Sequence, residues 1–328
     1  MSGLQRIKIE VVNDDVLRFR ADALVLKHAQ VSLGVDAAAK QLLGLNLEMS
    51  LGPGGQLILD GRPAVGAEKV VFLGVPPLRE FGYAEIRLFA RRAVCIVAAE
   101  FPDARQMALT LHGAGYGLDE IACLDAELAG LLDAFELETV SPSLERVAIV
   151  EADLGRAERL RRHLEKTLSG SALSGDTAGT VTIPFAGEIG NKVGNVSSQT
   201  PSDRDHAFVA MPFAKQFEDV FHYGIAPSIH SVGLLCERID QATFTGDVLA
   251  RMKERITTAT LMVADLTDAN PNVYLEVGFA WAADVPTVLV HHRDSELKFD
   301  VQGQKCLNYS TIKELEERLA PELKKLVD

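Results

Sequence analysis

The first part of the chain alternates short apolar runs with segments of helical periodicity. Runs of strand length lie at residues 7–12, 21–26, 69–75 and 107–115, and segments with the three-to-four-residue period of a helix lie at 85–101 and 118–135. Strands that alternate with amphipathic helices are typical of an α/β layer structure. We therefore predict an α/β domain here.

The last part of the chain repeats this alternation more regularly, as four strand-then-helix units. The expected strands lie at 206–213, 234–240, 260–266 and 287–292, and the expected helices at 218–232, 246–259, 272–284 and 312–326. Runs such as Leu261–Ala264 are apolar at successive positions, which indicates strands covered on both faces in a parallel sheet. Right-handed crossovers then predict an open, doubly wound sheet.

A segment without sustained apolar period separates the two parts. Residues 169–200 are rich in Gly, Ser and Thr, which is typical of a flexible linker, although 181–185 could form a short strand. We expect domains at 1–168 and 201–328, joined by this linker. The length of 328 residues fits two domains of roughly 100 to 200 residues each.

Charge and hydropathy restrict the partners. The chain has 46 acidic and 33 basic residues, a net charge of −13, and both parts are acidic. Such a chain lacks the basic excess with which proteins bind nucleic acid. No apolar run approaches the roughly 20 residues of a membrane helix, and residues 1–10 do not resemble a signal peptide. We expect a cytoplasmic protein whose partner is neither nucleic acid nor membrane, with its four cysteines as thiols.

Polar residues follow the expected strands of the second domain. Ligands bind beyond the carboxyl ends of the strands in open parallel sheets, so these residues are candidates for a site. They are Met211, Pro212 and Phe213 after the first strand, Glu237 to Asp240 after the second, Asp265 to Asp268 after the third, and His291 and His292 after the fourth. The adjacent histidines point to opposite faces of a strand, so we expect no metal.

Glu276 is the most distinctive of the candidates. Asn270 is a credible N-cap, Pro271 suits the first helical position, and the following helix is apolar almost all round, with Glu276 as its one charge before Asp284. A lone carboxylate in such a helix faces either desolvation or a pocket. Alternatively, it only complements the helix dipole or pairs with Arg238.

The second domain resembles the TIR-like and nucleoside 2-deoxyribosyltransferase-like superfamily. The resemblance is carried by FVAMPF at 208–213, ADLTDANPNVYLEVGFAWA at 264–282 and FDVQGQKCLNY at 299–309. It implies a flavodoxin-like fold and a catalytic glutamate, here Glu276, that attacks or stabilises the anomeric carbon of a ribose. A carboxylate suits this chemistry because cleavage of an N-glycosidic bond develops positive charge on the sugar.

Other residues of the second domain could complete such a site. Asp265 is the best placed second carboxylate for ribose hydroxyls, and Asp240 is a weaker candidate. Asn270 and Asn272 could bind sugar or phosphate, or only cap the helix and form the turn. Met211, Pro212 and Phe213 could line a base pocket, or belong to the core. Arg238 could bind a phosphate or pair with Asp240 or Glu276.

The first domain resembles a macro domain, especially the macro-like amino-terminal domain of leucyl aminopeptidases. The residues that carry this resemblance lie at 20–40, 66–75 and 110–121. It implies a phosphate loop made by Gly113, Gly115, Tyr116 and Gly117. The other loop, at 28–36, lacks the asparagine-rich and glycine-rich pattern of macro domains, and nothing corresponds to the aminopeptidase catalytic domain.

The two resemblances together suggest a function. We expect a nucleotide N-glycosidase, of which an NAD glycohydrolase acting as a bacterial defence effector is the leading form, with NAD as substrate and no cofactor. A nucleoside or nucleotide 2-deoxyribosyltransferase and a non-catalytic module that binds a nucleotide signal are the alternatives. The TIR-like resemblance also implies a homo-oligomer.

Overall fold

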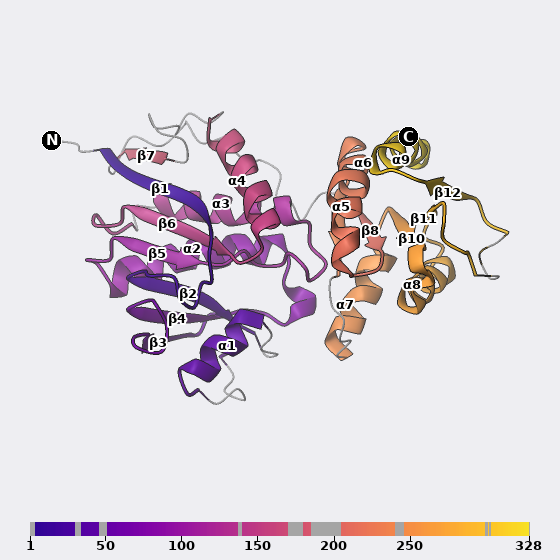
Figure 1. The fold of residues 1–328 in the computed structure, drawn as a ribbon. Coiled ribbons are helices and arrows are strands. Elements are labelled where there is room, and N and C mark those ends of the chain that lie inside the picture. Colours follow the sequence, from indigo (N-terminus) through magenta and orange to yellow (C-terminus); the bar gives the residue numbers. More distant parts are fainter. Residues whose placement is uncertain are drawn as a thin grey trace. The chain divides into compact units, whose positions relative to one another are not determined.

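The protein forms two α/β units, each built on its own sheet (Figure 1). The computed structural model describes residues 4–29, 34–45, 51–136, 140–169, 180–184, 205–239, 246–298, 301 and 303–327. The first unit comprises Met1–Gly113 and Glu120–Ser202, and the second comprises Ala114–Asp119 and Asp203–Asp328. Six residues from within the expected first domain therefore belong to the second unit.

The first unit has a seven-stranded mixed sheet of order β3-β4-β2-β5-β6-β1-β7. The strands are β1 (Leu4–Asn13), β2 (Ala23–His28), β3 (Gln56–Asp60), β4 (Lys69–Gly74), β5 (Gln106–Leu109), β6 (Arg146–Glu151) and β7 (Thr180–Pro184). The two edge strands pair antiparallel, β3 with β4 and β7 with β1, and the inner pairs are parallel. Strand β7 is the short strand that the sequence allowed within the Gly, Ser and Thr-rich segment.

The α-helices in the described part of this unit are α1 (Gly34–Leu42), α2 (Tyr83–Glu100), α3 (Glu120–Glu136) and α4 (Leu154–Ser169). Helices α2 and α3 pack against each other, while α4 packs on β1 and β6. Residues 85–101 and 118–135 are helical almost as expected, since α2 and α3 cover nearly the same residues. The strands β3 and β6 and the helices α1 and α4 were not predicted from the apolar pattern.

The second unit has a five-stranded, entirely parallel sheet of order β12-β11-β10-β8-β9. The strands are β8 (His206–Ala210), β9 (Leu235–Arg238), β10 (Leu261–Asp265), β11 (Thr287–His292) and β12 (Cys306–Tyr309). This is the order of flavodoxin-like folds, so the expected doubly wound parallel sheet is confirmed. Strand β12 was not foreseen.

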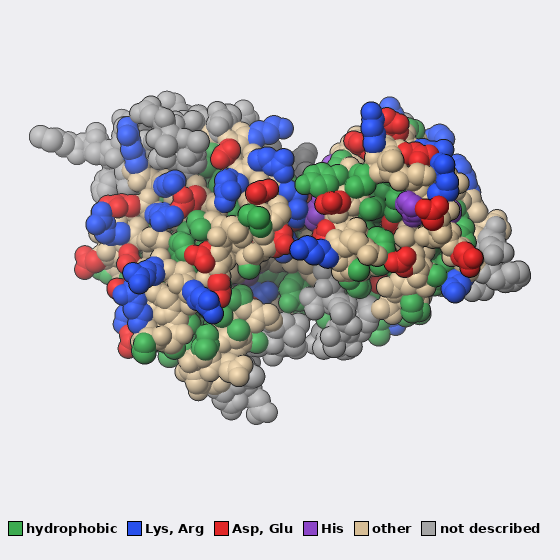
Figure 2. Space-filling view, in the orientation of Figure 1, with side chains coloured by type: hydrophobic (Ala, Val, Ile, Leu, Met, Phe, Trp, Pro, Cys, Tyr) green, Lys and Arg blue, Asp and Glu red, His purple; other side chains and the backbone are tan. Residues whose placement is uncertain are grey.

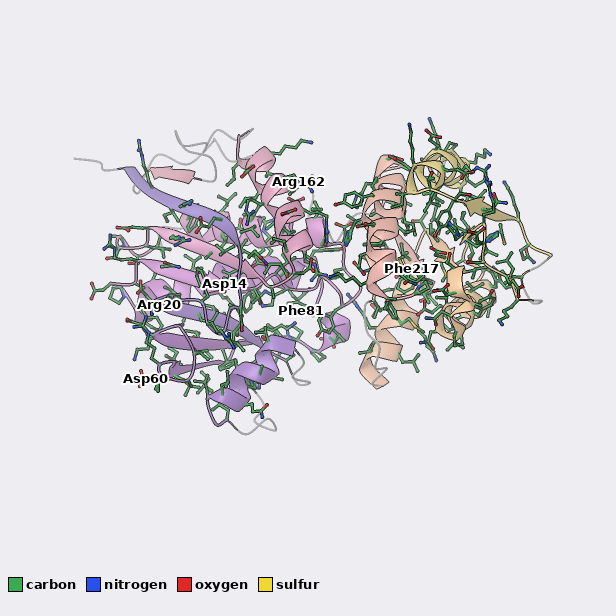
Figure 3. All side chains as sticks on the ribbon, viewed as in Figure 1. Asp14, Arg20, Asp60, Phe81, Arg162 and Phe217 are labelled. Atoms are coloured by element: carbon green, nitrogen blue, oxygen red, sulfur yellow. The ribbon has the colours of Figure 1, made fainter. Side chains whose placement is uncertain are left out.

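Helices cover both faces of the second sheet. They are α5 (Glu218–Val220), the π-helix η4 (Phe221–Ile225), α6 (Ala226–Ser231), α7 (Gly246–Thr257), α8 (Pro271–Ala282) and α9 (Ile312–Val327). Helices η4, α6 and α9 share one core with β8 and β10, in which Phe217 (labelled in Figure 3) is buried. Helices α7 and α8 pack against each other, and α8 also packs on β8, β10 and β11.

Acidic and basic side chains are intermixed over both units on the face shown in Figure 2. None of the helices in the described part of the chain is long and apolar enough to cross a membrane. The four cysteines, all within the described residues, form no disulfide.

Candidate functional site

The topological switch point of the second sheet lies between β8 and β10. These two strands are parallel neighbours, with Ala264 opposite Ala210, and the chain leaves their carboxyl ends toward different edges of the sheet. Ligands of open α/β sheets bind at such a point. Met211 follows β8 and Asp265 ends β10, so these two candidates lie at the switch point.

Asp265 is fully buried and holds a network of donors. The Tyr309 hydroxyl donates to Oδ2 at 2.8 Å, and the Thr267 amide donates to Oδ1 at 3.0 Å. The Thr267 hydroxyl also donates to Oδ1, and it accepts a hydrogen bond from the His292 amide at 2.9 Å. Burial raises the pKa of Asp265, although these donors oppose the shift. Asp265 thereby ties the end of β10 to β11 and β12.

A strained loop follows Asp265. Asp268 and Ala269 have φ values of 63° and 48°, in the left-handed region that residues other than glycine rarely adopt. The Gln216 amide donates to the Asp268 carboxylate at 3.2 Å, so the loops that follow β8 and β10 are joined.

Helix α8 begins as the sequence predicts. Asn270 is its N-cap, its side chain accepts from the Asn272 amide at 2.9 Å, and Pro271 occupies the first turn. This hydrogen bond supports the capping interpretation of Asn270. Asn272 is half-buried and contributes its backbone amide to the cap.

Glu276 lies on the buried side of α8, beside Val273, Val277 and Ala280. The residue is only 5% exposed, and within the described part of the chain its carboxyl group has no hydrogen bond or ion pair. Burial alone raises the pKa of Glu276 to about 8. The alternative of a pair with Arg238 is wrong, because Arg238 has another partner.

Arg238, at the end of β9, pairs with Glu218. Its Nη2 donates to the Glu218 carboxylate at 3.0 Å, Nη1 lies 3.5 Å from the Met211 sulfur, and the guanidinium stacks 3.9 Å from the Phe221 ring centroid. The hydrogen bond from His222, together with the Arg238 charge, lowers the pKa of Glu218 to about 2. A carboxylate and a ring from one helical segment therefore fix this guanidinium.

The candidate residues fall on two faces of the sheet. Side chains alternate along a strand, and Val263 of β10, Met211 and Cys236 of β9 belong to the core shared with α6 and α9. Asp265 and Arg238, two positions beyond Val263 and Cys236, are on that same face, and their partners Tyr309 and Phe221 lie in the same core. Glu276 is carried by α8, which packs with α7. Asp265 and α8, which carries Glu276, therefore lie on opposite faces of the sheet.

The remaining candidates of the second unit are less informative. Met211 and Pro212 are buried and Phe213 is half-buried, whereas Asp240 lies outside the described residues. His291 bonds through Nδ1 to the His292 carbonyl. The described residues contain no group of three or more His, Cys, Asp or Glu that could hold a metal ion.

The glycine loop of the first domain has an unexpected place. Gly113, Gly115 and Gly117 have φ values of 88°, 81° and 92°, which glycine adopts without strain. Residues Ala114–Asp119 belong to the second unit, where the Gly117 amide donates to the Arg238 carbonyl at 3.2 Å and Tyr116 bridges Ile239. The Gly117 amide is therefore engaged by backbone.

The first unit also buries ionisable side chains. His112 Nδ1 lies 3.9 Å from the Glu127 carboxylate, and both side chains are almost fully buried. Burial raises the pKa of Glu127 well above its usual range. Burial also lowers the pKa of His112 well below its usual range. Asp36, in the first turn of α1, has a pKa raised to about 6 by burial.

Two partners in the second unit were not predicted from the sequence: Glu218 and Tyr309. Glu218 and His222 are four residues apart, the spacing at which helical side chains meet. Tyr309 ends the FDVQGQKCLNY motif, although the motif itself does not indicate its hydrogen bond to Asp265.

No protein-family model matches the chain, and no curated protein matches it. Among solved structures, it is similar to a mutant Oceanobacillus iheyensis macrodomain with ADPR (13% identity, TM-score 0.41), which covers 51% of this chain and 100% of that one. A Trypanosoma brucei macrodomain in complex with ADP (15%, TM-score 0.37) covers 48% and 68%, respectively. The macrodomain of Mycobacterium tuberculosis DarG (19%, TM-score 0.32) covers 44% and 97%. At these values no residue role is transferred to this chain.

Proposed function

We propose that the second unit cleaves the N-glycosidic bond of a nucleotide, with NAD as the leading substrate and Glu276 as the carboxylate that meets the sugar cation. The observation that carries the proposal is the buried Glu276 carboxyl group, which has no partner among the described residues and lies on a helix that starts at the switch point of the sheet. Buried carboxyl groups without partners are costly, and strongly perturbed ionisable groups are concentrated at functional sites.

The proposed reaction uses Glu276 in its ionised form. As the bond between the anomeric carbon and nicotinamide breaks, its electron pair leaves with the nicotinamide nitrogen and positive charge develops on the ribose. The Glu276 carboxylate stabilises or captures this cation, and water then supplies the hydroxyl group and releases a proton. A positively charged nicotinamide ring in the bound substrate would lower the pKa of Glu276 and favour this ionised form.

The other residues take supporting roles in this proposal. Asp265 orders the loop that starts α8, since its carboxylate is occupied by Thr267 and Tyr309. We assign Arg238 to a substrate phosphate, which would displace its partner Glu218, and Met211 lies beside the Arg238 guanidinium. The first unit would bind a ligand or mediate assembly, and a role as defence effector remains part of the proposal.

The first prediction tests Glu276 directly. Glu276→Gln in the full chain should lower nicotinamide release from NAD by on the order of 100- to 1,000-fold, because the amide cannot neutralise the sugar cation. Chromatography of the incubation measures the release. Glu296→Gln, which changes an exposed glutamate in the same way, is the matched control and should behave as wild type.

The outcome also separates the alternatives. Nicotinamide release by folded Glu276→Gln at the wild-type rate would contradict the mechanism. Transfer of the sugar to an added free base would favour the deoxyribosyltransferase. Calorimetric binding of NAD or ADP-ribose without turnover would favour the binding module.

A further inference from the structure

The segment Ala114–Asp119 is held by the second unit, although the chain belongs to the first unit on both sides of it. We call these six residues the strap. Three glycines with positive φ, two of them inside the strap and Gly113 just before it, form its turns.

The strap pairs with the free edge of the second sheet. Among the described residues, strand β9 is the last strand of that sheet, and the outer side of an edge strand offers its backbone groups to a further segment. The Gly117 amide donates to the Arg238 carbonyl at 3.2 Å, and Tyr116 forms an antiparallel bridge with Ile239. A Cβ atom at Gly117 would lie 3.0 Å from Cγ1 of Ile239, so the fit is close.

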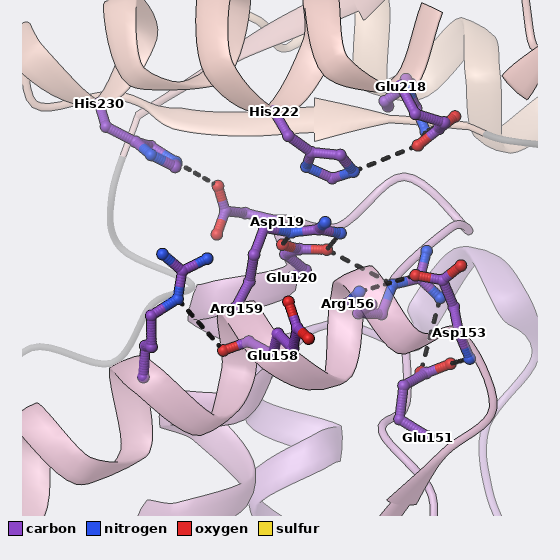
Figure 4. A network of polar contacts seen from close by, with 12 residues as sticks. Asp119, Glu120, Glu151, Asp153, Arg156, Glu158, Arg159, Glu218, His222 and His230 are labelled. Atoms are coloured by element: carbon purple, nitrogen blue, oxygen red, sulfur yellow. Dashed lines mark hydrogen bonds and ion pairs between the residues drawn. The ribbon is translucent and has the colours of Figure 1, made fainter. Parts of the chain in front are cut away.

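Asp119 anchors the end of the strap. It is 3% exposed, and its Oδ2 accepts from the Cys236 amide of β9 at 2.9 Å and from the His230 ring at 2.6 Å (Figure 4). The next residue, Glu120, is fixed in the first unit, where Arg159 donates to it at 2.6 Å. The Asp119–Glu120 peptide therefore joins two carboxylates that are each anchored in a different unit.

We infer that the strap is a positioning element for the candidate site of the second unit: it fixes the carboxyl end of β9 and thereby the place of Arg238. The strap holds the backbone of β9 at Cys236 and Arg238, while Glu218 and Phe221 hold the Arg238 side chain. Asp119 and Gly117 are thus positioning residues. The consequence for nucleotide binding rests on the proposed function of this site.

The test compares Asp119→Ala with Asp119→Asn in the full chain. Asp119→Ala leaves the Cys236 amide without its acceptor, so we expect the KM for NAD to rise about tenfold, with kcat changed by less than about twofold. Asp119→Asn keeps an acceptor oxygen and should recover part of the affinity. A merely structural role would reduce the active fraction and hence kcat, and would leave KM unchanged.

A second pair of variants tests the edge pairing. Gly117→Ala adds a Cβ against Ile239 in a residue with a φ of 92°, whereas Gly54→Ala adds one at a φ of 89° with no atom within 4 Å. Only Gly117→Ala should raise KM. Hydrogen–deuterium exchange of residues 235–239 should be faster in Gly117→Ala and Asp119→Ala, and unchanged in Gly54→Ala.

The possible failures can be distinguished. Unchanged KM and unchanged exchange of residues 235–239 in Asp119→Ala would overturn the role of the strap. If wild-type protein neither binds nor cleaves NAD, the proposed function is overturned, and the exchange of residues 235–239 alone then decides whether the strap fixes β9.

Discussion

The buried carboxyl groups on the two faces of the second sheet differ in their hydrogen bonding. On the face shared with α6 and α9, Asp265 receives hydrogen bonds from Thr267 and Tyr309. On the face covered by α7 and α8, Glu276 receives none from the described residues. A carboxylate whose oxygens are occupied orders the surrounding chain, whereas one without partners is available for a ligand.

Hydrogen-bond partners, rather than burial or pKa, distinguish the two buried carboxyl groups. Both residues are buried and both have a raised pKa, so neither burial nor titration separates them. The partners do. The loop at residues 267–269 carries the chain from Asp265 to α8, so two carboxylates eleven residues apart in sequence belong to different faces of the sheet.

The largest effect should come from breaking the satisfied network. Asp265→Ala leaves the donors of Thr267 and Tyr309 without an acceptor in the core, and should lower the free energy of unfolding by about 3 to 5 kcal/mol. Urea unfolding followed by fluorescence measures this in the second unit, because the one tryptophan, Trp281, lies in α8. Asp265→Asn keeps one acceptor and should lose about half as much. An unchanged free energy of unfolding in Asp265→Ala would contradict the role of Asp265 in ordering the loop before α8.

The second effect has the opposite sign. The pKa of Glu276 is about 8 in the folded protein against an ordinary value of 4.5, so the folded state binds the additional proton between these values. Stability should therefore fall as pH rises from about 4.5 to 8. Glu276→Gln removes this penalty, and at pH 8 it should stabilise the second unit by on the order of 2 to 4 kcal/mol.

The measurement is urea unfolding of wild type and Glu276→Gln at pH 5 and pH 8. The two proteins should differ much more at pH 8, and Glu296→Gln should follow wild type at both. The same ionisation should appear in catalysis, where kcat/KM for NAD rises with pH up to about 8, since the carboxylate is the active form. A pH-independent difference would show that Glu276 is not held neutral.

The sequence was sufficient for the parallel sheet of the second unit except its edge strand β12, and for local features of the site. Continuous apolar strands indicated a parallel sheet, and the Asn270-Pro271 pair indicated the start of α8. The sequence did not show that the candidate residues lie on two faces of the sheet. Strands that are apolar at every position do not indicate which helix covers which face. The partner Glu218 was not predicted for Arg238, because it approaches from another element.

Some of the elements that were not predicted are visible in the sequence pattern, and others are not. Helix α4 is rich in charge, yet Ala157, Leu160, Leu164 and Leu168 repeat at three and four residues and are all buried, so its period was readable. The strap was not readable. Its partners in β9 are more than a hundred residues away, and its glycines suit an anion loop as well as a backbone turn.

The smallest effect concerns the loop between the two faces. Ala269 has a φ of 48°, where an alanine costs about 1 to 2 kcal/mol relative to glycine. Ala269→Gly relieves this strain but gives the unfolded chain more freedom, so we expect a net stabilisation of about 0.5 kcal/mol. Ala214→Gly, in the exposed loop after β8 with an ordinary φ of −70°, gains only the unfolded-state freedom and should destabilise slightly. Urea unfolding followed through Trp281 compares the two variants. Equal destabilisation by both would show that the loop after Asp265 stores no strain, and that the position of α8 is set by its packing alone.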